Sequence, residues 1–475
     1  MNYTIEDEQS IPLIPVTEST INVFLESQTQ SIINWIQNTN FNASPHDYCV
    51  VPDGKGNIQM VLFGLHENSD SPDAAYIWSI SNLAKSIPVE TYHLETNWSN
   101  EEIVLAQIGW GLGAYQYNFF KQETQGQKST AILKIKEKDI KEINAFVDAF
   151  TLVRDLVNTP ANHMMPEDLS AFSQEISEES GATFTEIIGD ALLEENFPAI
   201  HAVGRASVHA PRLLQINWNM ESNYPLVVLV GKGVCFDTGG LDLKPSKFMR
   251  HMKKDMGGAA HVLGLAHLIM TLELPVRLQV LIPAVDNAIS GDAYRPGDVI
   301  DTRAFKTVEV DNTDAEGRIV LCDALTFAEE SSPDIIIDFA TLTGAARVAV
   351  GTEIPALFCN SNKLSNDIQG ACENSGELVW PLPLHQGYRY QLNSSIADIA
   401  NASSEGYGGA ITAALYLNEF VDSETDWAHI DVMALNTRQR PGRPKGGEAM
   451  GLLVIYKFLQ QRYQNTIAIS KETVH

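Results

Sequence analysis

The sequence predicts an α/β protein of two domains: a smaller amino-terminal α/β domain, and a carboxy-terminal domain with a mixed central β-sheet flanked by helices. Two observations support this fold class. In the carboxy-terminal part, apolar runs rich in β-branched residues lie at 226–230, 278–282, 335–339 and 429–432. These runs alternate with helical patterns, as in layered α/β folds. An amphipathic segment near residue 140 separates this region from an amino-terminal part in which short strand-like runs mix with helical stretches.

The amino-terminal domain is expected to span residues 1–136. It mixes short strand-like runs, such as 59–63 and 131–135, with helical stretches such as 20–37. Residues 137–157 form a predicted helical connector, because apolar residues recur at helical spacing in this segment. The break at Thr159-Pro160 ends that helix, and residues 158–475 form the larger domain.

The bulk composition restricts the partners and the compartment. The formal charge of −28 over 475 residues disfavours a nucleic-acid partner, since phosphate binding needs a basic surface. Five widely spaced cysteines argue against a disulfide framework. The amino terminus lacks the charge pattern of a signal peptide, and no apolar run approaches the length of a membrane span. A cytoplasmic protein without membrane association is therefore expected.

The most informative motif is Asn-Thr-Asp-Ala-Glu-Gly-Arg at 312–318. In extended backbone, residues i and i+2 project to the same side, so Asp314 and Glu316 could reach one metal ion or one pair of metals. A solvated acidic turn would have the same composition. The choice between these interpretations depends on a second cluster upstream.

The second cluster follows the strand-like run at 226–230. Lys232 and Asp237 lie near the end of that strand, Lys244 follows a glycine-rich turn, and Asp255 precedes a helical pattern. Ligands in α/β sheets commonly gather at the carboxyl ends of strands. Taken singly, Asp237 could favour a turn, Asp255 could cap a helix, and both lysines could be surface residues.

Taken together, the two clusters combine four carboxylates with two lysines and an arginine, in glycine-rich turns between apolar segments. Buried carboxylates need neutralising cations, and a pair of divalent metals achieves this while creating a hydrolytic centre. Histidine is scarce among these residues, which favours an oxygen-rich site for Zn²⁺ or Mn²⁺ over a histidine-dominated zinc site.

At these residues the chain resembles the leucine (cytosol) aminopeptidase family, the M17-type dimetal aminopeptidases. The resemblance rests on 230–260 and on 312–321, where Ile319 stands in place of the family's usual leucine. Further similar segments lie at 156–162, 340–345, 409–414 and 427–431. The similarity covers the chain from about residue 150 to 460, so it implies that 158–475 is a catalytic peptidase domain and that 1–136 supports assembly.

The resemblance also implies a ligand set for two divalent ions. Lys232, Asp237, Asp255 and Glu316 would hold an exchange-prone metal. Asp237, Asp314 and Glu316 would hold the second metal, with the Asp314 backbone carbonyl contributing. Lysine is an unusual ligand because its amine must lose a proton, which neighbouring positive charge and burial both favour.

Lys244 and Arg318 are the catalytic residues that the resemblance implies. Lys244 would polarise the scissile carbonyl, and Arg318 would hold a bicarbonate ion that acts as general base. The implied reaction is hydrolysis of the amino-terminal residue from short peptides with a free amino terminus, by a cytoplasmic homohexamer. Two alternatives stay open: a dipeptidase-like cleavage of Cys-Gly, and a DNA-binding or architectural role.

The substrate pocket is where the chain departs from the family. By resemblance, the first side chain would be bordered by Met252, Asn312, Thr341, Leu342 and Gly344. After Asp431 the family usually continues with small residues and a methionine, whereas this chain has Met433, which would narrow the pocket, and Asn436, which would add polarity. The basic run 438–445 follows, for which we expect a solvated loop.

One further motif and two histidines have alternative interpretations. Asp237-Thr238-Gly239 also matches the aspartic-protease triplet, but that chemistry needs a second such aspartate, which only a homodimer could provide. His251 could support the metal site or lie on the surface. His429 falls in a presumed strand, where a hydrogen-bonded core histidine is expected.

Overall fold

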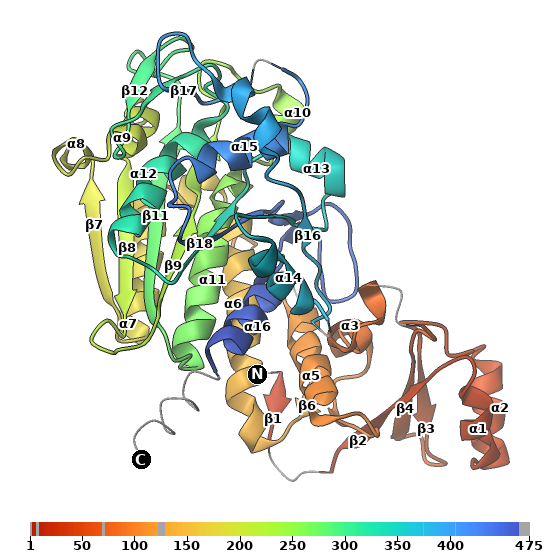
Figure 1. The fold of residues 1–475 in the computed structure, drawn as a ribbon. Coiled ribbons are helices and arrows are strands. Elements are labelled where there is room, and N and C mark those ends of the chain that lie inside the picture. Colours follow the sequence, from red (N-terminus) through yellow and green to blue (C-terminus); the bar gives the residue numbers. More distant parts are fainter. Residues whose placement is uncertain are drawn as a thin grey trace. The chain divides into compact units, whose positions relative to one another are not determined.

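The computed structural model of the chain describes residues 2–5, 9–68, 72–121, 129–373, 375–403 and 405–464. The chain forms two compact units (Figure 1). The first contains residues 1–151, 373–376 and 438–445, and the second contains 152–372, 377–437 and 446–475. The division falls within helix α6 (Ile140–Asn158).

The first unit is built on a six-stranded sheet with the order β1-β6-β5-β2-β4-β3. Its strands are β1 (Tyr3–Thr4), β2 (Ile11–Val16), β3 (Tyr48–Pro52), β4 (Ile58–Gly64), β5 (Thr91–Leu94) and β6 (Ile132–Lys134). All neighbours are parallel except β3 and β4. The strands predicted at 59–63 and 131–135 are thus confirmed as β4 and β6.

The helices of the first unit are short, apart from one. They are α1 (Ile21–Glu26), α2 (Gln30–Asn38), α3 (Tyr76–Ser79), α4 (Leu83–Ser86) and α5 (Asn100–Ala114). The helical stretch predicted at 20–37 forms two helices, because α1 ends at Glu26 and Thr29 is extended. The Ser27 hydroxyl donates to the Phe24 carbonyl, a local bond that competes with helix continuation.

The second unit is built on a nine-stranded mixed sheet with the order β16-β15-β18-β14-β9-β11-β8-β7, and β10 also pairs with β11. Its strands are β7 (Thr183–Ile188), β8 (Arg212–Trp218), β9 (Leu226–Gly231), β10 (Gly233–Asp237), β11 (Arg277–Asn287), β14 (Ile335–Ala340), β15 (Ala356–Cys359), β16 (Trp380–Pro381) and β18 (Asp426–Asp431). The central strands β18, β14, β9 and β11 are parallel, whereas the pairs β11–β8, β8–β7 and β18–β15 are antiparallel. The mixed sheet and its four predicted strands are confirmed.

Helices and short strands complete the second unit. The helices are α7 (Pro166–Glu179), α8 (Ala191–Glu194), α9 (Pro198–Gly204), α10 (Ser246–Met249), α11 (Gly257–Thr271), α12 (Glu316–Glu330), α13 (Gly344–Val350), α14 (Asn362–Gly370), α15 (Gly409–Asn418) and α16 (Leu452–Tyr463). The short strands are β12 (Val299–Asp301), β13 (Thr307–Glu309), β17 (Ile399–Ala400), β19 (Leu435–Asn436) and β20 (Gly446–Gly447).

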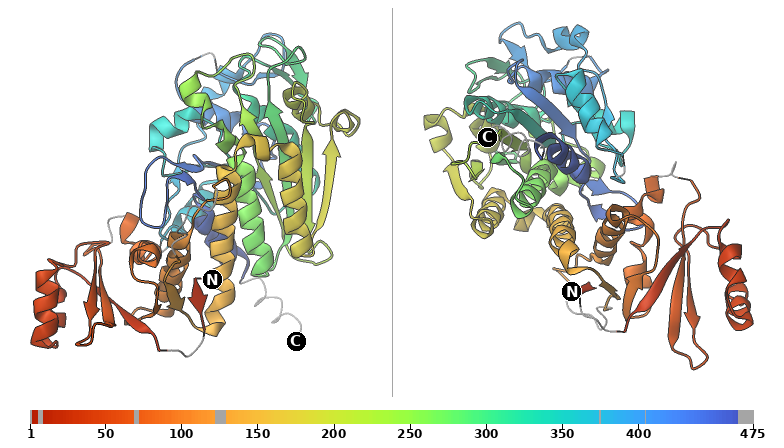
Figure 2. Two further views of the ribbon diagram at one scale, coloured as in Figure 1. Left: turned by 180° about the vertical axis from the view of Figure 1, so that it is seen from behind. Right: turned by 60° about the horizontal axis from the view of Figure 1, so that its bottom comes forward.

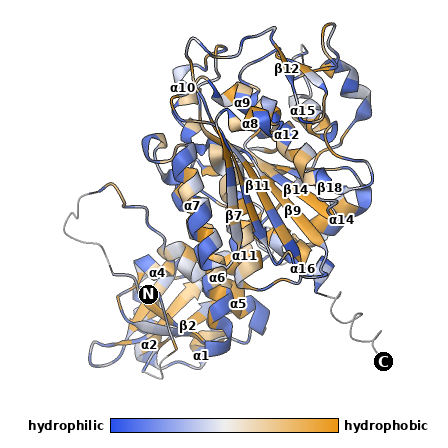
Figure 3. Cartoon of the chain, turned by 90° about the vertical axis from the view of Figure 1, so that its left-hand side faces the viewer, coloured by the Kyte–Doolittle hydropathy of each residue, from blue (hydrophilic) through white to orange (hydrophobic). Residues whose placement is uncertain are grey.

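Helices cover both faces of the large sheet. Side chains of a strand alternate between its faces, and in β9 Val228 and Val230 pack in one apolar cluster with residues of α9, α12 and α15. On the opposite face β9 contacts α11, which lies beside α7 (Figure 2). Strands β9 and β14 are therefore buried along their whole length and are predominantly hydrophobic (Figure 3).

The carboxyl ends of the parallel strands meet at one edge of this sheet. β9 and β10 lead to Lys232 and Asp237, β14 leads to Thr341, and β18 ends at Asp431. In α/β sheets this edge is the usual position of a binding site. Among the residues that the structure describes, no helix is both long and apolar enough to cross a membrane.

Candidate metal centre

Asp237 is positioned by strand β10, of which it is the last residue. Its Oδ1 accepts hydrogen bonds from the Gly239 amide and from the Asn287 side chain, both at 2.8 Å. Its Oδ2 lies 2.7 Å from Lys244 Nζ. The side chain thus stabilises the turn that follows, as the simpler interpretation expected, and also presents its second oxygen to the charged cluster.

Asp255 lies in a 3₁₀ turn (Met252–Met256) immediately before α11. Its Oδ2 is 2.6 Å from Lys232 Nζ, and its Oδ1 accepts a 2.8 Å bond from the Thr341 hydroxyl. The alternative that Asp255 caps the following helix is wrong, because the residue before α11 is Met256 and makes no side-chain cap.

Glu316 begins α12 and is 1% exposed. Its Oε1 lies 2.7 Å from Lys232 Nζ, whereas its buried Oε2 has no hydrogen-bond partner among the described residues. Asp314, two residues earlier, places Oδ1 2.5 Å from Lys244 Nζ. The motif at 312–318 is therefore a charged, largely buried turn and not a solvated one.

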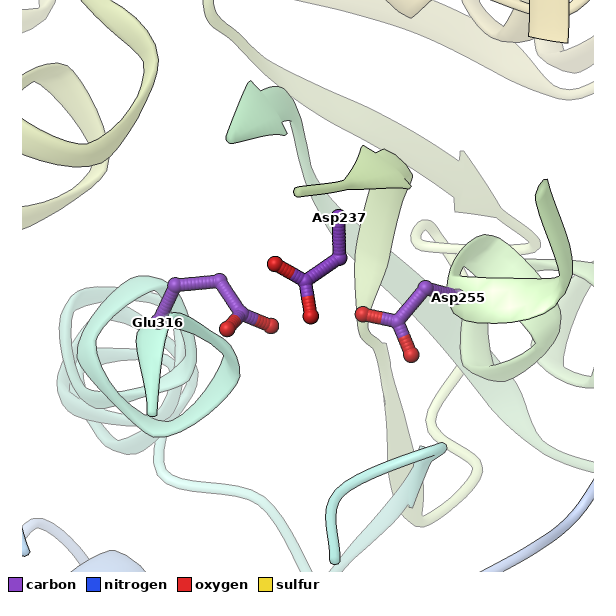
Figure 4. Close-up of side chains that lie close together, drawn as sticks. All are labelled: Asp237, Asp255 and Glu316. Atoms are coloured by element: carbon purple, nitrogen blue, oxygen red, sulfur yellow. The ribbon is translucent and has the colours of Figure 1, made fainter. Parts of the chain in front are cut away.

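The two clusters predicted from the sequence converge in space. Asp237, Asp255 and Glu316 are all buried, and each offers one oxygen so that these atoms lie within 4.8 Å of one another. Figure 4 shows the three carboxylates pointing towards one another from separate elements. Carboxylate oxygens at such separations suit a divalent cation, and the orphaned Glu316 Oε2 is an acceptor that such an ion would satisfy. The residues present fit a metal.

Lys232 is the cation at the centre of this cluster. Besides its two carboxylate partners, its ammonium donates a 3.2 Å bond to the Thr341 carbonyl, so all three N–H groups are engaged. The side chain passes directly over Gly317, where an added Cβ would lie 2.5 Å from Lys232 Cε. A side chain at 317 would displace the lysine, which explains the glycine between Glu316 and Arg318.

Burial and like charge raise the pKa of two carboxyl groups of the cluster, whereas a neighbouring ammonium lowers the pKa of a third. Burial, reinforced by Asp237, raises the pKa of Glu316 to about 8 and that of Asp314 to about 6. For Asp255, burial would raise the pKa, but Lys232 outweighs it and lowers the pKa to about 2. Asp255 is thus the carboxyl group whose ionised form the neighbouring ammonium groups, Lys232 first and then Lys254, favour.

The two lysines hold their protons firmly. Burial alone would lower the pKa of Lys232 and of Lys244, but neighbouring carboxylates outweigh burial and raise the pKa of both. For Lys232 these are Asp255 and Glu316, and for Lys244 the largest contribution is from Asp237.

Arg318 lies in the first turn of α12 and is 8% exposed. One of its terminal nitrogens donates a 2.7 Å bond to the Asn401 carbonyl, while its buried Nε has no partner among the described residues. The fully buried Asn401 also holds the backbone of the motif, accepting from the Asp311 and Asn312 amides and donating to the Asn312 and Ala315 carbonyls.

Most of the expected pocket residues lie on segments that adjoin these carboxylates. Met252 begins the 3₁₀ turn of Asp255, and Asn312 Oδ1 accepts a bond from the Asp314 amide. Thr341, Leu342 and Gly344 follow β14.

That loop after β14 is held by Asp431, the last residue of β18. The Asp431 carboxylate accepts bonds from the Leu342 and Thr343 amides and from the Thr343 hydroxyl. Arg347 lies 2.6 Å from the same carboxylate.

The two residues that depart from the family pattern have different surroundings. Met433 is partly buried just after β18. Asn436 in β19 is 3% exposed, and its amide nitrogen donates a 2.6 Å bond to Glu448 Oε2. Glu448 in turn forms a 2.8 Å ion pair with the fully buried Arg154. The Asn436 side chain is therefore tied into a buried network.

The basic run 438–445 belongs to the first unit, and its expected exposure was wrong for two of its arginines. Arg440 and Arg443 are 8% and 6% exposed. Arg443 pairs with Asp73, and its guanidinium lies 4.0 Å from the ring centroid of Trp78. Paired, buried arginines do not form a phosphate-binding surface, so this run gives no support to the DNA-binding alternative.

His429 and His251 have different surroundings. His429 is 1% exposed, its Nδ1 lies 2.5 Å from Asp338 Oδ1, and its ring stacks against Trp427, which confirms the prediction of a hydrogen-bonded core histidine. His251 is exposed.

Three polar residues that contact the site were not predicted from the sequence: Asn287, Tyr294 and Asn401. Asn287 ends the buried strand β11, so a polar residue at the carboxyl end of a strand was the one available signal. The Tyr294 hydroxyl donates a 2.7 Å bond to the Thr313 carbonyl. Tyr294 and Asn401 lie in loops whose approach to the motif has no local signature.

Family models match both parts of the chain. Residues 151–456 match the catalytic domain of the cytosol aminopeptidase family, and residues 11–133 match the M17 aminopeptidase amino-terminal domain. A probable cytosol aminopeptidase of Roseiflexus castenholzii is 38% identical over 427 residues, covering 85% of this chain and 87% of that protein. One of Chlorobium limicola is 41% identical over 312 residues, and this match spans 65% of the chain but only 62% of that relative.

Solved structures of similar proteins agree with these matches. The cytosol aminopeptidase from Coxiella burnetii has a TM-score of 0.92 and 42% identity, covering 96% of this chain and 98% of that one. The bottromycin maturation enzyme BotP in complex with Mn has a TM-score of 0.85 and 30% identity, covering 96% and 99%. The chain therefore belongs to the cytosol aminopeptidase family of M17 hydrolases, as its metal-site motifs predicted.

Proposed function

We propose that this chain is a metal-dependent aminopeptidase that removes the amino-terminal residue from short peptides. The observation that carries the proposal is the convergence of Asp237, Asp255 and Glu316, whose oxygens lie within 4.8 Å of one another. Family membership supplies the reaction class. In this chain the three carboxylates form a buried, oxygen-rich cage. One proposed ligand atom, Glu316 Oε2, has no partner among the described residues.

Five residues are proposed as metal ligands. Lys232, Asp237, Asp255 and Glu316 would hold one ion, and Asp237, Asp314 and Glu316 the other, together with the Asp314 carbonyl. When bound, a pair of divalent ions supplies Lewis-acid polarisation and lowers the pKa of water towards neutrality. Zn²⁺ and Mn²⁺ both accept these ligands, and the manganese complex of BotP supports Mn²⁺ as one candidate.

Lys244 is proposed to stabilise negative charge on the scissile carbonyl. It lies beside the cage, within 2.7 Å of both Asp237 and Asp314, and these carboxylates keep it cationic by raising its pKa. A cation preorganised next to a developing oxyanion contributes about 3–4 kcal/mol of transition-state stabilisation.

Arg318 is proposed to hold a bicarbonate ion that acts as the general base. Its guanidinium is buried and fixed by the Asn401 carbonyl, and its Nε is an unused donor among the described residues. A planar guanidinium suits a planar, bidentate anion. With this arrangement, none of the carboxylates of the cage would be needed for proton transfer.

The free amino group of the substrate is proposed to bind beside Asp255, which restricts cleavage to the first residue. The side chain of the substrate's first residue would be bordered by the residues expected from the sequence, which are Met252, Asn312, Thr341, Leu342, Gly344, Met433 and Asn436. We propose that residues 158–475 form the catalytic domain and that residues 137–157 form a helical connector. Residues 1–136 would support assembly into a cytoplasmic homohexamer.

The test is metal reconstitution of the full-length chain followed by a substrate profile. Metal-free protein would be loaded with Zn²⁺ or Mn²⁺ and assayed with unblocked Leu, Met and Arg chromogenic substrates and with Cys-Gly. Release that depends on added metal is expected, and the profile distinguishes a broad aminopeptidase from a Cys-Gly dipeptidase. Absence of release with either metal on every substrate would overturn the proposal.

A further inference from the structure

Asn287 is a buried polar residue that joins the two halves of the metal cage. It ends strand β11, is 0% exposed, and is paired in register with Asp237. Its amide nitrogen donates to Asp237 Oδ1 at 2.8 Å and to the Thr313 carbonyl at 3.2 Å. Both hydrogens of the amide are thus used, one on each half of the cage.

The backbone of Asn287 strengthens the same connection. Its carbonyl accepts a 2.6 Å bond from the Thr238 hydroxyl and a 3.3 Å bond from the Thr238 amide. The end of β11 is therefore fixed to the turn that follows Asp237. The Asn287 side chain cannot move without breaking the two hydrogen bonds that it donates. A rigid donor is what a ligand carboxylate needs for a defined orientation.

The amide oxygen of Asn287 does not share in this network. Asn287 Oδ1 is buried and accepts no hydrogen bond from the described residues. A residue retained only to fill this space could be apolar, and would avoid the cost of an unsatisfied buried acceptor. The cost of this unsatisfied acceptor is offset only if the two hydrogen bonds that the Asn287 amide donates contribute to the site.

We infer that Asn287 is a positioning residue for the proposed metal centre. It and the Gly239 amide occupy Asp237 Oδ1, so that Oδ2 is the oxygen left to face the cage. Through Thr313 it sets the distance between Asp237 and the segment carrying Asp314 and Glu316. The inference rests on the proposed function, because the ligands that Asn287 would position are those of the same metal ions.

The neutrality of the amide is part of this role. A carboxylate at 287 would repel Asp237, and an ammonium would compete with the metal for it. An amide donates two hydrogen bonds while leaving the charge of the cage unchanged. Residues that orient metal ligands in this way typically affect metal affinity by about 10- to 100-fold when they are replaced.

The decisive variant is Asn287→Leu in the full-length chain. Leucine has nearly the shape of asparagine and removes the two donated bonds, while the lost acceptor has no partner among the described residues. We expect the Kd for Mn²⁺ and Zn²⁺, measured by competition with a chromophoric chelator, to rise by about 10- to 100-fold. The midpoint of thermal unfolding of the metal-free protein should change far less than it does for the metal-loaded protein.

Gln279→Met is the matched control. Gln279 is a 3% exposed amide on the same strand β11, bonded to Ser331 and to Asn217, away from the cage. Its loss should leave metal affinity unchanged. An equal loss of affinity in both variants would show a general effect of damaging β11 and would overturn the inference.

A second variant covers the case in which leucine does not fit. Asn287→Ala adds no bulk, and the same weakening of metal binding is expected. If wild-type protein binds metal and a folded Asn287 variant binds it equally well, the inference fails while the proposed function stands. If wild-type protein binds neither metal, the proposed function itself fails.

Discussion

Lys232 Nζ lies 2.6 Å from Asp255 Oδ2, and both side chains are 3% exposed. The two residues are 23 positions apart in the sequence and come from different elements, a strand end and a 3₁₀ turn. The lysine is thus a buried counter-ion of these carboxylates. A metal that uses Lys232 as a ligand must therefore displace a proton from it.

Metal binding is expected to release a proton from Lys232. Burial would lower the pKa of Lys232, but Asp255 and Glu316 raise it further than burial lowers it, so the metal-free protein carries an ammonium, which has no lone pair. Calorimetric titration in buffers of different ionisation enthalpy measures the protons released. Lys232→Met should release fewer protons per metal bound, and an unchanged number would contradict a lysine ligand.

Metal affinity should rise with pH between about 6 and 8. Ligand carboxyls must be ionised to bind a metal, and burial raises the pKa of Asp314 to about 6 and that of Glu316 to about 8. Both values lie above the ordinary ones of 3.8 and 4.5.

The stability of the metal-free protein should change in the opposite sense. A raised folded-state pKa favours the protonated form, so this contribution is complete below about pH 4 and is lost as pH rises through 6 to 8. Chelator competition and thermal unfolding at a series of pH values check both trends. Metal affinity independent of pH in this window would contradict the assignment.

Glu316→Gln should abolish turnover and leave the fold intact. The change is isosteric and removes one charge from the proposed bridging ligand, whose Oε2 has no partner among the described residues. Activity and metal content would be measured together with the circular dichroism spectrum. Glu330→Gln, on the exposed end of the same helix, is the control and should keep activity. A fully active Glu316→Gln protein would refute the role.

Acetylation of the substrate amino group should prevent cleavage. The proposed contact of the free amine beside Asp255 needs an unblocked nitrogen, and an acetyl group both removes its basicity and adds bulk. The rates of paired free and acetylated peptides of one sequence give the comparison. Equal rates would contradict amine recognition while leaving a hydrolytic metal centre possible.

Arg443→Ala should destabilise the first unit without affecting any binding to DNA. It removes the ion pair with Asp73 and the cation–π contact with Trp78, at a cost of about 1–3 kcal/mol in the free energy of unfolding. Arg438→Ala, at an exposed position, should cost little. Both proteins and the wild type are expected to pass unretained through a DNA column at low salt. Retention that falls with salt and is lost in these variants would revive the DNA-binding alternative.

The sequence allowed much of the fold to be predicted where a local pattern carries the information. Buried, β-branched runs such as 226–230 identify the central strands because side chains on both faces must be apolar. The helical stretch predicted at 20–37 is interrupted between α1 and α2, because local hydrogen bonds such as that of Ser27 compete with helix continuation. The placement of 438–445 in the first unit could not be predicted, because Arg443 is buried by Asp73 and Trp78, which lie more than 360 residues earlier.

For the site, the sequence alone was sufficient to predict the family and the residue types of the proposed ligands. The prediction was possible because the proposed site residues fall in two short segments, one with Lys232, Asp237 and Asp255 and the other with Asp314, Glu316 and Arg318. The spacings within these segments fit few other kinds of active site. The pairing of the charges, the bond from Arg318 to the Asn401 carbonyl and the connection of the two segments by the Asn287 amide are visible only in the folded chain. Hydrogen bonds act over about 3 Å, so contacts between distant segments exist only after the strands align, and no local pattern records them.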